Sequence, residues 1–154
     1  MLTAGKLYNF PDRDCSAKAS DGELHLDDNG LERYQTEYID PIVELVKEYS
    51  DVRMIFIYEP DGLANLITNM SMEKCANAAD AYTESTIYTL GQLDFENVAI
   101  YLDAAHAGWL GWPDNLEPTA AVYGDIYKEA GSPKAVRGLV TNVSNYNPVS
   151  PPLI

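Results

Sequence analysis

Three aspartates in this chain follow apolar runs, at the points where turns are expected to begin. Asp61 comes after the run at residues 52–58, Asp103 comes after residues 98–102, and Asp14 lies in a turn that follows residues 6–10. In a (β/α) barrel, residues at the carboxyl ends of strands line the reaction centre, whereas acids elsewhere keep the surface soluble. The positions of the three carboxylates therefore predict one active site assembled from successive strand ends.

Asp61 has the context expected of a general acid. A carboxyl group held in a partly desolvated pocket after an apolar strand has a raised pKa, and its protonated form donates a proton to a leaving-group oxygen, as acetal hydrolysis requires. Asp14 is the natural partner, because a second carboxylate nearby disfavours ionisation of the first. The alternatives are that Asp61 caps a following helix and that Asp14 pairs with the adjacent Arg13.

Two tryptophans, Trp109 and Trp112, lie in the Gly-rich stretch of residues 107–113, which is too irregular to bury both indoles in a helix core. Exposed indoles favour flat apolar partners, and successive pyranose rings along a glycan provide them. Both could instead be structural tryptophans under a loop. His106 precedes them and is either a donor to a sugar hydroxyl or a satisfied core histidine.

Hydrophobic periodicity places these residues on alternating strands and helices. It predicts strands ending at 6–10 and spanning 52–58, 98–102 and 135–141, with helices over 27–49, 76–93 and 116–130. Pro41 is expected to kink the first helix. The result is an α/β fold of about four parallel strands with right-handed crossovers, too few for a closed barrel of about eight strands. A half-barrel and a small open sheet both remain possible.

Bulk composition excludes several classes of function. The formal net charge is −14 with only 10 Lys and Arg, which disfavours nucleic acid and anionic membranes as partners. No apolar stretch reaches the roughly 20 residues that span a bilayer, and the first residues lack a signal peptide, so the start is expected to be internal to a longer protein. No cofactor or metal is expected, because Cys15, Cys75 and the two histidines lack metal-ligand spacing. The cysteines form either one disulfide or two free thiols.

Four groups of local motifs follow one another along nearly the whole chain. They are Tyr8-x-x-Pro11-x-Arg13-Asp14-Cys15 with Ala19-Ser20-x-Gly22-Glu23, Glu59-Pro60-Asp61 with Leu63-Ala64-Asn65-Leu66 and Thr68-Asn69, Tyr101-Leu102-Asp103-Ala104 with His106 to Pro113, and Arg137-Gly138-Leu139 with Thr141-Asn142-Val143 and Asn145-Tyr146-Asn147. In this uninterrupted order they resemble one known family, glycoside hydrolase family 6, and especially its fungal-type cellobiohydrolases.

The resemblance implies hydrolysis of β-1,4-glucosidic bonds with inversion, on a distorted TIM-like barrel. Asp61 matches the general acid, and Asp14 matches the carboxylate that keeps this acid protonated. The residues that match contacts to the sugar chain are Tyr8, Ser20, Asp103, His106, Trp109, Trp112 and Asn145. Cys15 and Cys75 match a disulfide pair. The implied substrates are cellulose and cello-oligosaccharides, cleaved from non-reducing ends by a secreted, extracellular monomer.

The chain departs from the family pattern in three substitutions and in length. Gly62 stands where serine is usual, Ala105 where glycine is usual, and Tyr58 where an aliphatic residue is usual. The family's first barrel strand and its later strands have no counterpart here, so residues 1–154 are expected to form a single partial catalytic domain. An endo-acting β-1,4-glucanase and a catalytically silent glucan-binding fragment are the alternatives.

Overall fold

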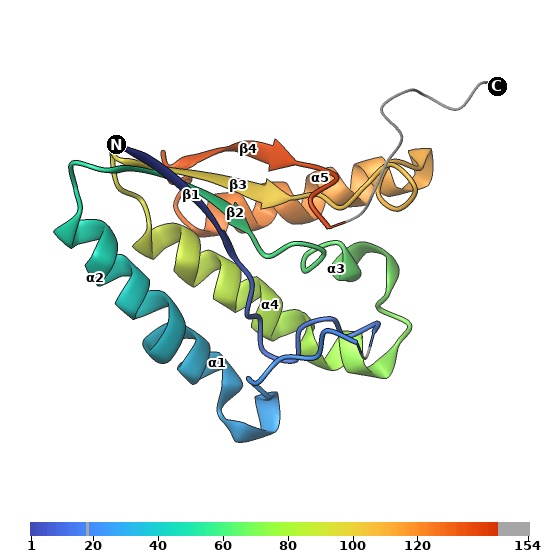
Figure 1. Ribbon diagram of the computed structural model, residues 1–154. Coiled ribbons are helices and arrows are strands. Elements are labelled where there is room, and N and C mark those ends of the chain that lie inside the picture. The colour runs from blue at the N-terminus through green and yellow to red at the C-terminus, as the bar shows by residue number, and fades with distance from the viewer. Residues whose placement is uncertain (18, 145–154) are drawn as a thin grey trace.

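The computed structural model describes residues 1–17 and 19–144 and has an α/β architecture (Figure 1). Its one sheet has four parallel strands in the order β1-β2-β3-β4. The strands are β1 (Leu2–Leu7), β2 (Arg53–Tyr58), β3 (Val98–Asp103) and β4 (Val136–Val140). The predicted fold class is confirmed, with the sheet open at both edges within the described residues.

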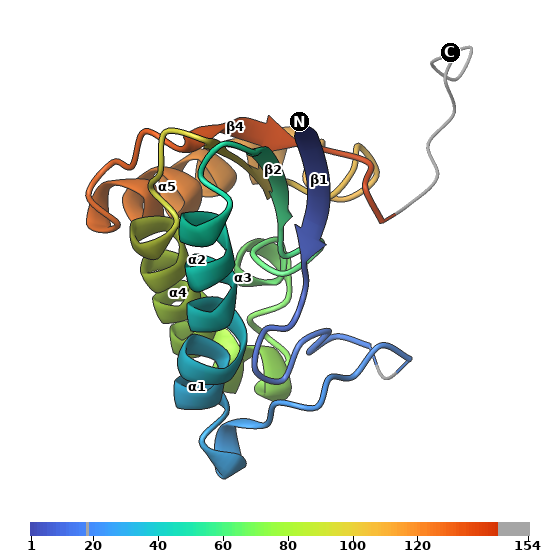
Figure 2. The same ribbon diagram turned by 60° about the vertical axis from the view of Figure 1, so that its left-hand side comes forward.

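The connections between the strands are helical. Residues between β1 and β2 form η1 (Leu26–Asp28), α1 (Gly30–Arg33), η2 (Tyr34–Ile39) and α2 (Asp40–Glu48), and the later connections contain α3 (Asn65–Thr68), α4 (Glu73–Gln92) and α5 (Pro113–Glu129). Sequential strand order with right-handed crossovers places successive helices on the same face of a sheet. Figures 1 and 2 show α2, α4 and α5 together on one face. None of the described helices is both long and apolar enough to cross a membrane.

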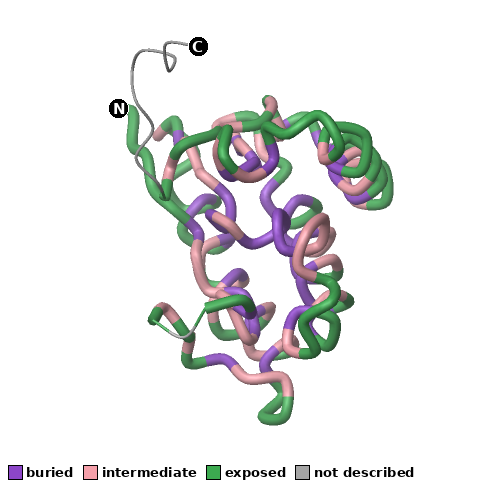
Figure 3. The backbone as a smooth tube through the Cα atoms, turned by 90° about the vertical axis from the view of Figure 1, so that its right-hand side faces the viewer, coloured by how far each residue is buried: buried purple, intermediate pink, exposed green. Residues whose placement is uncertain are grey.

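The core lies between the sheet and these helices, where the buried backbone is concentrated (Figure 3). Alternate strand residues, including Tyr58, Ile100 and Leu102, are buried toward the helices. Ile55 and Ile57 on β2 point to the other face and are only half-buried. A face of this kind is the inner side of the sheet in a (β/α) barrel, where the helices form the outer ring.

The strand register brings the carboxyl ends of β1, β2 and β3 level. Leu7 pairs with Tyr58, and Tyr58 pairs with Leu102. The residues that follow these three positions, namely Tyr8, Glu59 and Asp103, therefore form one row along this edge of the sheet. The active site predicted from the sequence is expected at this edge of the sheet.

Three elements differ from the sequence-based prediction. The first strand spans Leu2–Leu7 instead of ending at residues 6–10, because it is an edge strand whose residues are mostly exposed and carry little apolar signal. The helix expected over 27–49 is divided, and a π-helical segment, η2, ends directly before the helix that contains Pro41. Proline has no amide hydrogen and its ring crowds the carbonyl four residues back, which a wide turn relieves. The short helix α3 was not predicted.

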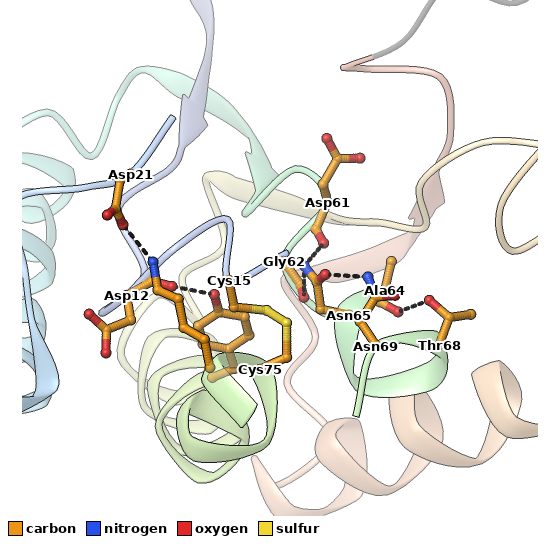
Figure 4. Close-up of a disulfide and its surroundings, with 12 residues drawn as sticks. Asp12, Cys15, Asp21, Asp61, Gly62, Ala64, Asn65, Thr68, Asn69 and Cys75 are labelled. Carbon is orange, nitrogen blue, oxygen red and sulfur yellow. Dashed lines mark hydrogen bonds and ion pairs between the residues drawn. A yellow bond between two sulfur atoms is a disulfide. The ribbon is translucent and has the colours of Figure 1, made fainter. Parts of the chain in front are cut away.

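The arm, defined as residues 8–17 after β1, is attached to α4 at several points (Figure 4). A disulfide joins Cys15 to Cys75, and the Tyr82 hydroxyl donates to the Asp12 carbonyl at 2.9 Å. The pairing predicted for these cysteines is thus present. Its sequence separation of 60 residues corresponds to about 4 kcal/mol of stabilisation in the chain-entropy model.

Phe10 explains why glycine occupies position 62. The Phe10 ring is 1% exposed and stacks on Tyr82 with centroids 4.5 Å apart. A Cβ atom added at Gly62 would lie 2.6 Å from Cε2 of this ring. The space that a side chain at position 62 would need is therefore occupied by the core.

Replacing Gly62 by alanine is expected to lower the free energy of unfolding by about 1–3 kcal/mol, because the buried Phe10 ring has to move. Gly91→Ala is the matched control: nothing lies within 4 Å of its added Cβ on α4, so a gain of about 0.5–1 kcal/mol is expected. Chemical denaturation measures both. The packing explanation fails if Gly62→Ala is as destabilising in a Phe10→Leu background as in the wild type.

Candidate active site

Asp61 lies in the tight turn that follows β2. Its backbone φ is 63°, and its carbonyl accepts a hydrogen bond from the Asn65 side chain at 2.9 Å. Figure 4 shows its carboxyl group pointing away from Asn65 and α3. Ala64, not Asp61, is the N-terminal cap residue of α3 and makes no side-chain cap, so the alternative that Asp61 caps a helix is wrong.

The environment of the Asp61 carboxyl favours its protonated form. Burial raises the pKa of Asp61, and the negative charge of Asp14 raises it further, while the Ser144 side chain and His106 act in the opposite direction. Its Oδ1 atom is buried and has no hydrogen-bond partner among the described residues. A half-buried carboxyl with a raised pKa is what a general acid requires.

Asp14 is held on the arm by Tyr8. The Tyr8 hydroxyl donates to Oδ2 of Asp14 at 2.7 Å, and the Ser20 side chain also contacts this hydroxyl. Burial, followed by the bond to Asp14, raises the pKa of Tyr8 to about 12, so the phenol remains a donor. The structure thus brings Tyr8, Asp14 and Ser20 together, and the charge of Asp14 acts on Asp61.

Arg13 supports the arm and does not pair with Asp14. Its Nε donates to the Ser20 carbonyl at 2.9 Å, its Nη1 donates to the Tyr8 carbonyl at 2.9 Å, and its guanidinium lies 4.6 Å from the centre of the Tyr8 ring. The alternative in which Asp14 is neutralised by Arg13 is therefore wrong.

Asp103 is the last residue of β3, contacts the backbone of Asp61 and is 2% exposed. Its Oδ2 accepts the backbone amides of Asp61 at 2.8 Å and Ala105 at 3.0 Å, while its Oδ1 is buried without a partner in the described part of the chain. Burial is the main cause that raises the pKa of Asp103 to about 6. Asp103 thus fixes the turn that carries Asp61. Its contact with substrate stays a prediction.

Glu59 is a residue that the sequence reasoning missed as a member of the site. It is 1% exposed and precedes Asp61 by two positions. Its carboxyl accepts the amides of Asn9 and Phe10 and the hydroxyl of Tyr34. Burial raises the pKa of Glu59 to about 7. The available signal was an acid placed directly after a continuous buried strand, where an unpartnered carboxylate is strongly disfavoured.

The two tryptophans lie in the loop between β3 and α5. Trp112 is 62% exposed and its Nε1 donates to the Gly108 carbonyl at 3.1 Å. Trp109 is half-buried, donates to the Thr68 hydroxyl at 2.6 Å, and has its ring centre 6.1 Å from that of His106. His106 acts on the pKa of both Asp61 and Asp103. His106 therefore belongs to the same cluster as the acids, and Asn145 lies outside the described residues.

Comparison with known proteins shows the family to which the chain belongs. The family model of glycosyl hydrolases family 6 matches residues 3–152. The chain is 57% identical over 141 residues to 1,4-beta-D-glucan cellobiohydrolase C of Emericella nidulans, and 55% identical to exoglucanase 2 of Hypocrea jecorina. A putative endoglucanase type B of Fusarium oxysporum is 53% identical. The chain belongs to glycosyl hydrolases family 6, as its motifs predicted.

Solved structures agree with this assignment. Cellobiohydrolase II (Cel6A) of Humicola insolens, in complex with glucose and cellotetraose, superposes with a TM-score of 0.95 at 51% identity, over 99% of this chain and 42% of that chain. The catalytic core domain of the cellobiohydrolase Cel6A from Chaetomium thermophilum superposes with a TM-score of 0.91 at 54% identity, over 94% of this chain and 40% of that chain. The alignment covers 92% of this chain but only 31% of the Emericella protein, and 30% of the Hypocrea and Fusarium proteins. The chain thus spans less than half the length of these relatives.

The buried acids predict how stability depends on pH. The pKa of Glu59 is raised from 4.5 to about 7 and that of Asp103 from 3.8 to about 6, so the folded chain binds these protons more tightly than the unfolded chain. Their contribution to stability is complete below the unfolded pKa values and is lost as the pH rises through the folded ones. The free energy of unfolding is therefore expected to fall between about pH 4 and pH 8.

In Glu59→Gln the fall in the free energy of unfolding over this pH range is expected to be smaller by on the order of 3 kcal/mol. Each pKa unit corresponds to about 1.4 kcal/mol. Urea denaturation across this pH range, with the exposed Glu48→Gln variant as control, measures the difference. An identical pH dependence in the wild type and Glu59→Gln would show that folding does not raise the pKa of Glu59.

Proposed function

We propose that this chain hydrolyses β-1,4-glucosidic bonds in cellulose and cello-oligosaccharides with inversion, releasing cellobiose from non-reducing chain ends. The observation that carries the proposal is the half-buried Asp61 carboxyl, whose pKa is raised by burial and by the charge of Asp14. A protonated carboxyl that shares a site with an ionised one is the usual arrangement for donating a proton to a glycosidic oxygen. Family membership supports the same chemistry.

In the proposed mechanism Asp61 donates its proton to the leaving-group oxygen. The ionised Asp14 stabilises the positive charge that develops on the sugar ring and keeps Asp61 protonated between turnovers. Tyr8, which donates to Asp14, and Ser20, which contacts the Tyr8 hydroxyl, are proposed to contact the distorted ring. Inversion needs room for a water molecule on the opposite face of the sugar. As the oxygen of this water bonds to the anomeric carbon, a second carboxylate accepts its proton, at a distance or through a water chain.

The remaining residues are proposed to bind the glucan. Trp112 offers an exposed indole and Trp109 a half-buried one, on the same loop as His106. Successive glucose rings would stack on these aromatic faces, while His106, Asp103 and Asn145 bind hydroxyl groups. The proposed partners are cellulose and cello-oligosaccharides, with no cofactor, metal, nucleic acid or membrane, and the chain is proposed to be monomeric.

We also propose that residues 1–154 are one partial catalytic domain of a longer secreted enzyme. The short coverage of the relatives and the open sheet edges support this arrangement. The disulfide between Cys15 and Cys75 fits an oxidising, extracellular location. An endo-acting glucanase is the second candidate, favoured by the name of the Fusarium relative. A silent glucan-binding fragment is the third, favoured by the exposed Trp112.

Asp61→Asn is expected to abolish hydrolysis, because the side-chain amide is not acidic enough to transfer a proton to the leaving group. Proton NMR of cellohexaose incubated with the protein identifies the anomer that forms before mutarotation. We expect early α-anomer with the wild type and with the exposed-site control Asp51→Asn, and none with Asp61→Asn.

Early β-anomer would contradict inversion. Unchanged cellohexaose together with a shift in tryptophan fluorescence would contradict catalysis and favour the silent glucan-binding fragment.

A further inference from the structure

Glu59 joins the two sides of the proposed site through its buried carboxyl group. Its Oε1 accepts the amide of Asn9 and the hydroxyl of Tyr34, each at 2.9 Å, and its Oε2 accepts the amide of Phe10 at 3.2 Å. Asn9 and Phe10 belong to the arm, directly after Tyr8. The proposed mechanism assigns no role to this carboxyl.

The bonds to Glu59 continue the sheet past its last paired residues. The amide of Glu59 donates to the Leu7 carbonyl at 2.8 Å, and the side chain of the same residue then binds the next two amides of the arm. Asp103 makes an equivalent contact one strand further on, where it accepts the amide of Asp61. The arm is thereby attached to the segment that carries Asp61, two residues beyond Glu59.

We propose that Glu59 is a positioning residue: its carboxyl group holds the arm against the end of β2, so that the charge of Asp14 acts on Asp61. Its catalytic consequence rests on the proposed function, but the positioning itself does not. If the arm is released from β2, the carboxylate of Asp14 moves away from Asp61. The part of the Asp61 pKa shift that comes from Asp14 is then lost.

The groups that face Glu59 let its carboxyl stay bonded in both protonation states. Tyr34 contacts Tyr58 at 3.1 Å with either hydroxyl as donor, and Tyr58 continues to Thr89. The Tyr34 hydroxyl can therefore accept a hydrogen bond from the protonated Glu59 carboxyl or donate one to the ionised carboxylate. Arg13 is the cation that acts on Glu59, and the charge of Glu59 acts on the phenols of Tyr34, Tyr38, Tyr58 and Tyr82.

Two substitutions separate the position of the arm from the charge of Glu59. A glutamine oxygen in the place of Oε2, which lies 3.1 Å from the Asn9 amide and 3.2 Å from the Phe10 amide, accepts from both. Its NH2 group then replaces Oε1 and donates to the Tyr34 hydroxyl, and the side chain carries no charge. Methionine has a similar shape and removes the acceptors. A positioning role therefore predicts that Glu59→Gln resembles the wild type and that Glu59→Met does not.

The test is a double-mutant cycle between Glu59 and Asp14, with the pKa of the Asp61 carboxyl as readout, measured by carbon-13 NMR titration of the 154-residue chain. We expect the pKa of Asp61 to fall in Glu59→Met and in Asp14→Asn, and to fall no further in the double variant. Glu59→Gln should leave it at the wild-type value. Additive effects of the two substitutions, or an equal fall in Glu59→Gln, would overturn the proposal.

A second measurement decides the question should Glu59→Met fail to fold. In the wild type the amide resonances of Asn9 and Phe10 are expected to shift together as Glu59 titrates, and this transition should be absent in Glu59→Gln. Wild-type amides that do not shift with pH would overturn the proposal without any use of the methionine variant.

Activity on cellohexaose separates this inference from the proposed function. In an active chain, Glu59→Met is expected to lower kcat by roughly tenfold to a hundredfold with KM little changed, and Glu59→Gln to restore it. An inactive wild type that still shows the expected cycle would reject the proposed function and retain the positioning role. An active wild type in which the effects of Glu59→Met and Asp14→Asn on the pKa of Asp61 are additive would reject the positioning role and retain the proposed function.

Discussion

Two buried carboxylates at the ends of neighbouring strands hold the proposed site together. Glu59 after β2 accepts amides of the arm that follows β1, and Asp103 at the end of β3 accepts the amide of Asp61 after β2. The segment after β1 is thus bound by the acid that follows β2, and the turn after β2 is bound by the acid at the end of β3. Because a buried carboxylate without donors is strongly disfavoured, the loops and the acids stabilise each other. The carboxyls of Asp14 and Asp61 depend on this arrangement for their relative position.

The same burial gives the site its chemistry. Removing carboxyl groups from water favours their protonated forms, and the effect is seen at Glu59, Asp61 and Asp103. Asp14 accepts a hydrogen bond from Tyr8, and its negative charge contributes to the raised pKa of Asp61. Burial and this neighbouring charge both favour the protonated form of Asp61. A carboxyl group with a raised pKa beside a second carboxyl is the arrangement that proton donation to a glycosidic oxygen requires.

The sequence predicted the elements whose side chains are buried in a regular pattern. Residues 52–58 form a continuous β-favouring run and residues 98–102 repeat this pattern, and the two became β2 and β3. The positions of the acids at the ends of these strands were therefore predicted correctly. The edge strand β1 is mostly exposed, and its bounds were predicted wrongly. The π-helical segment before Pro41 relieves the crowding between the proline ring and the preceding turn, which hydrophobic periodicity does not indicate.

The role of Glu59 depends on contacts between residues about fifty positions apart in the sequence. These contacts form because Leu7 pairs with Tyr58, which brings Glu59 next to the start of the arm. Two of the departures from the family pattern are likewise explained by contacts. Gly62 leaves room for Phe10, and the Tyr58 hydroxyl is bonded within the core. Ala105 adopts a φ of 51°, a conformation in which glycine is favoured.

The most direct test of this account is a carbon-13 NMR titration of the side-chain carboxyls of Glu59, Asp61 and Asp103 in the folded chain. The account predicts that all three titrate above their ordinary ranges, with Glu59 near 7 and Asp103 near 6. Carboxyls that titrate at the values usual for exposed acids would mean that the strand ends are open to water. The site described here would then not exist in solution.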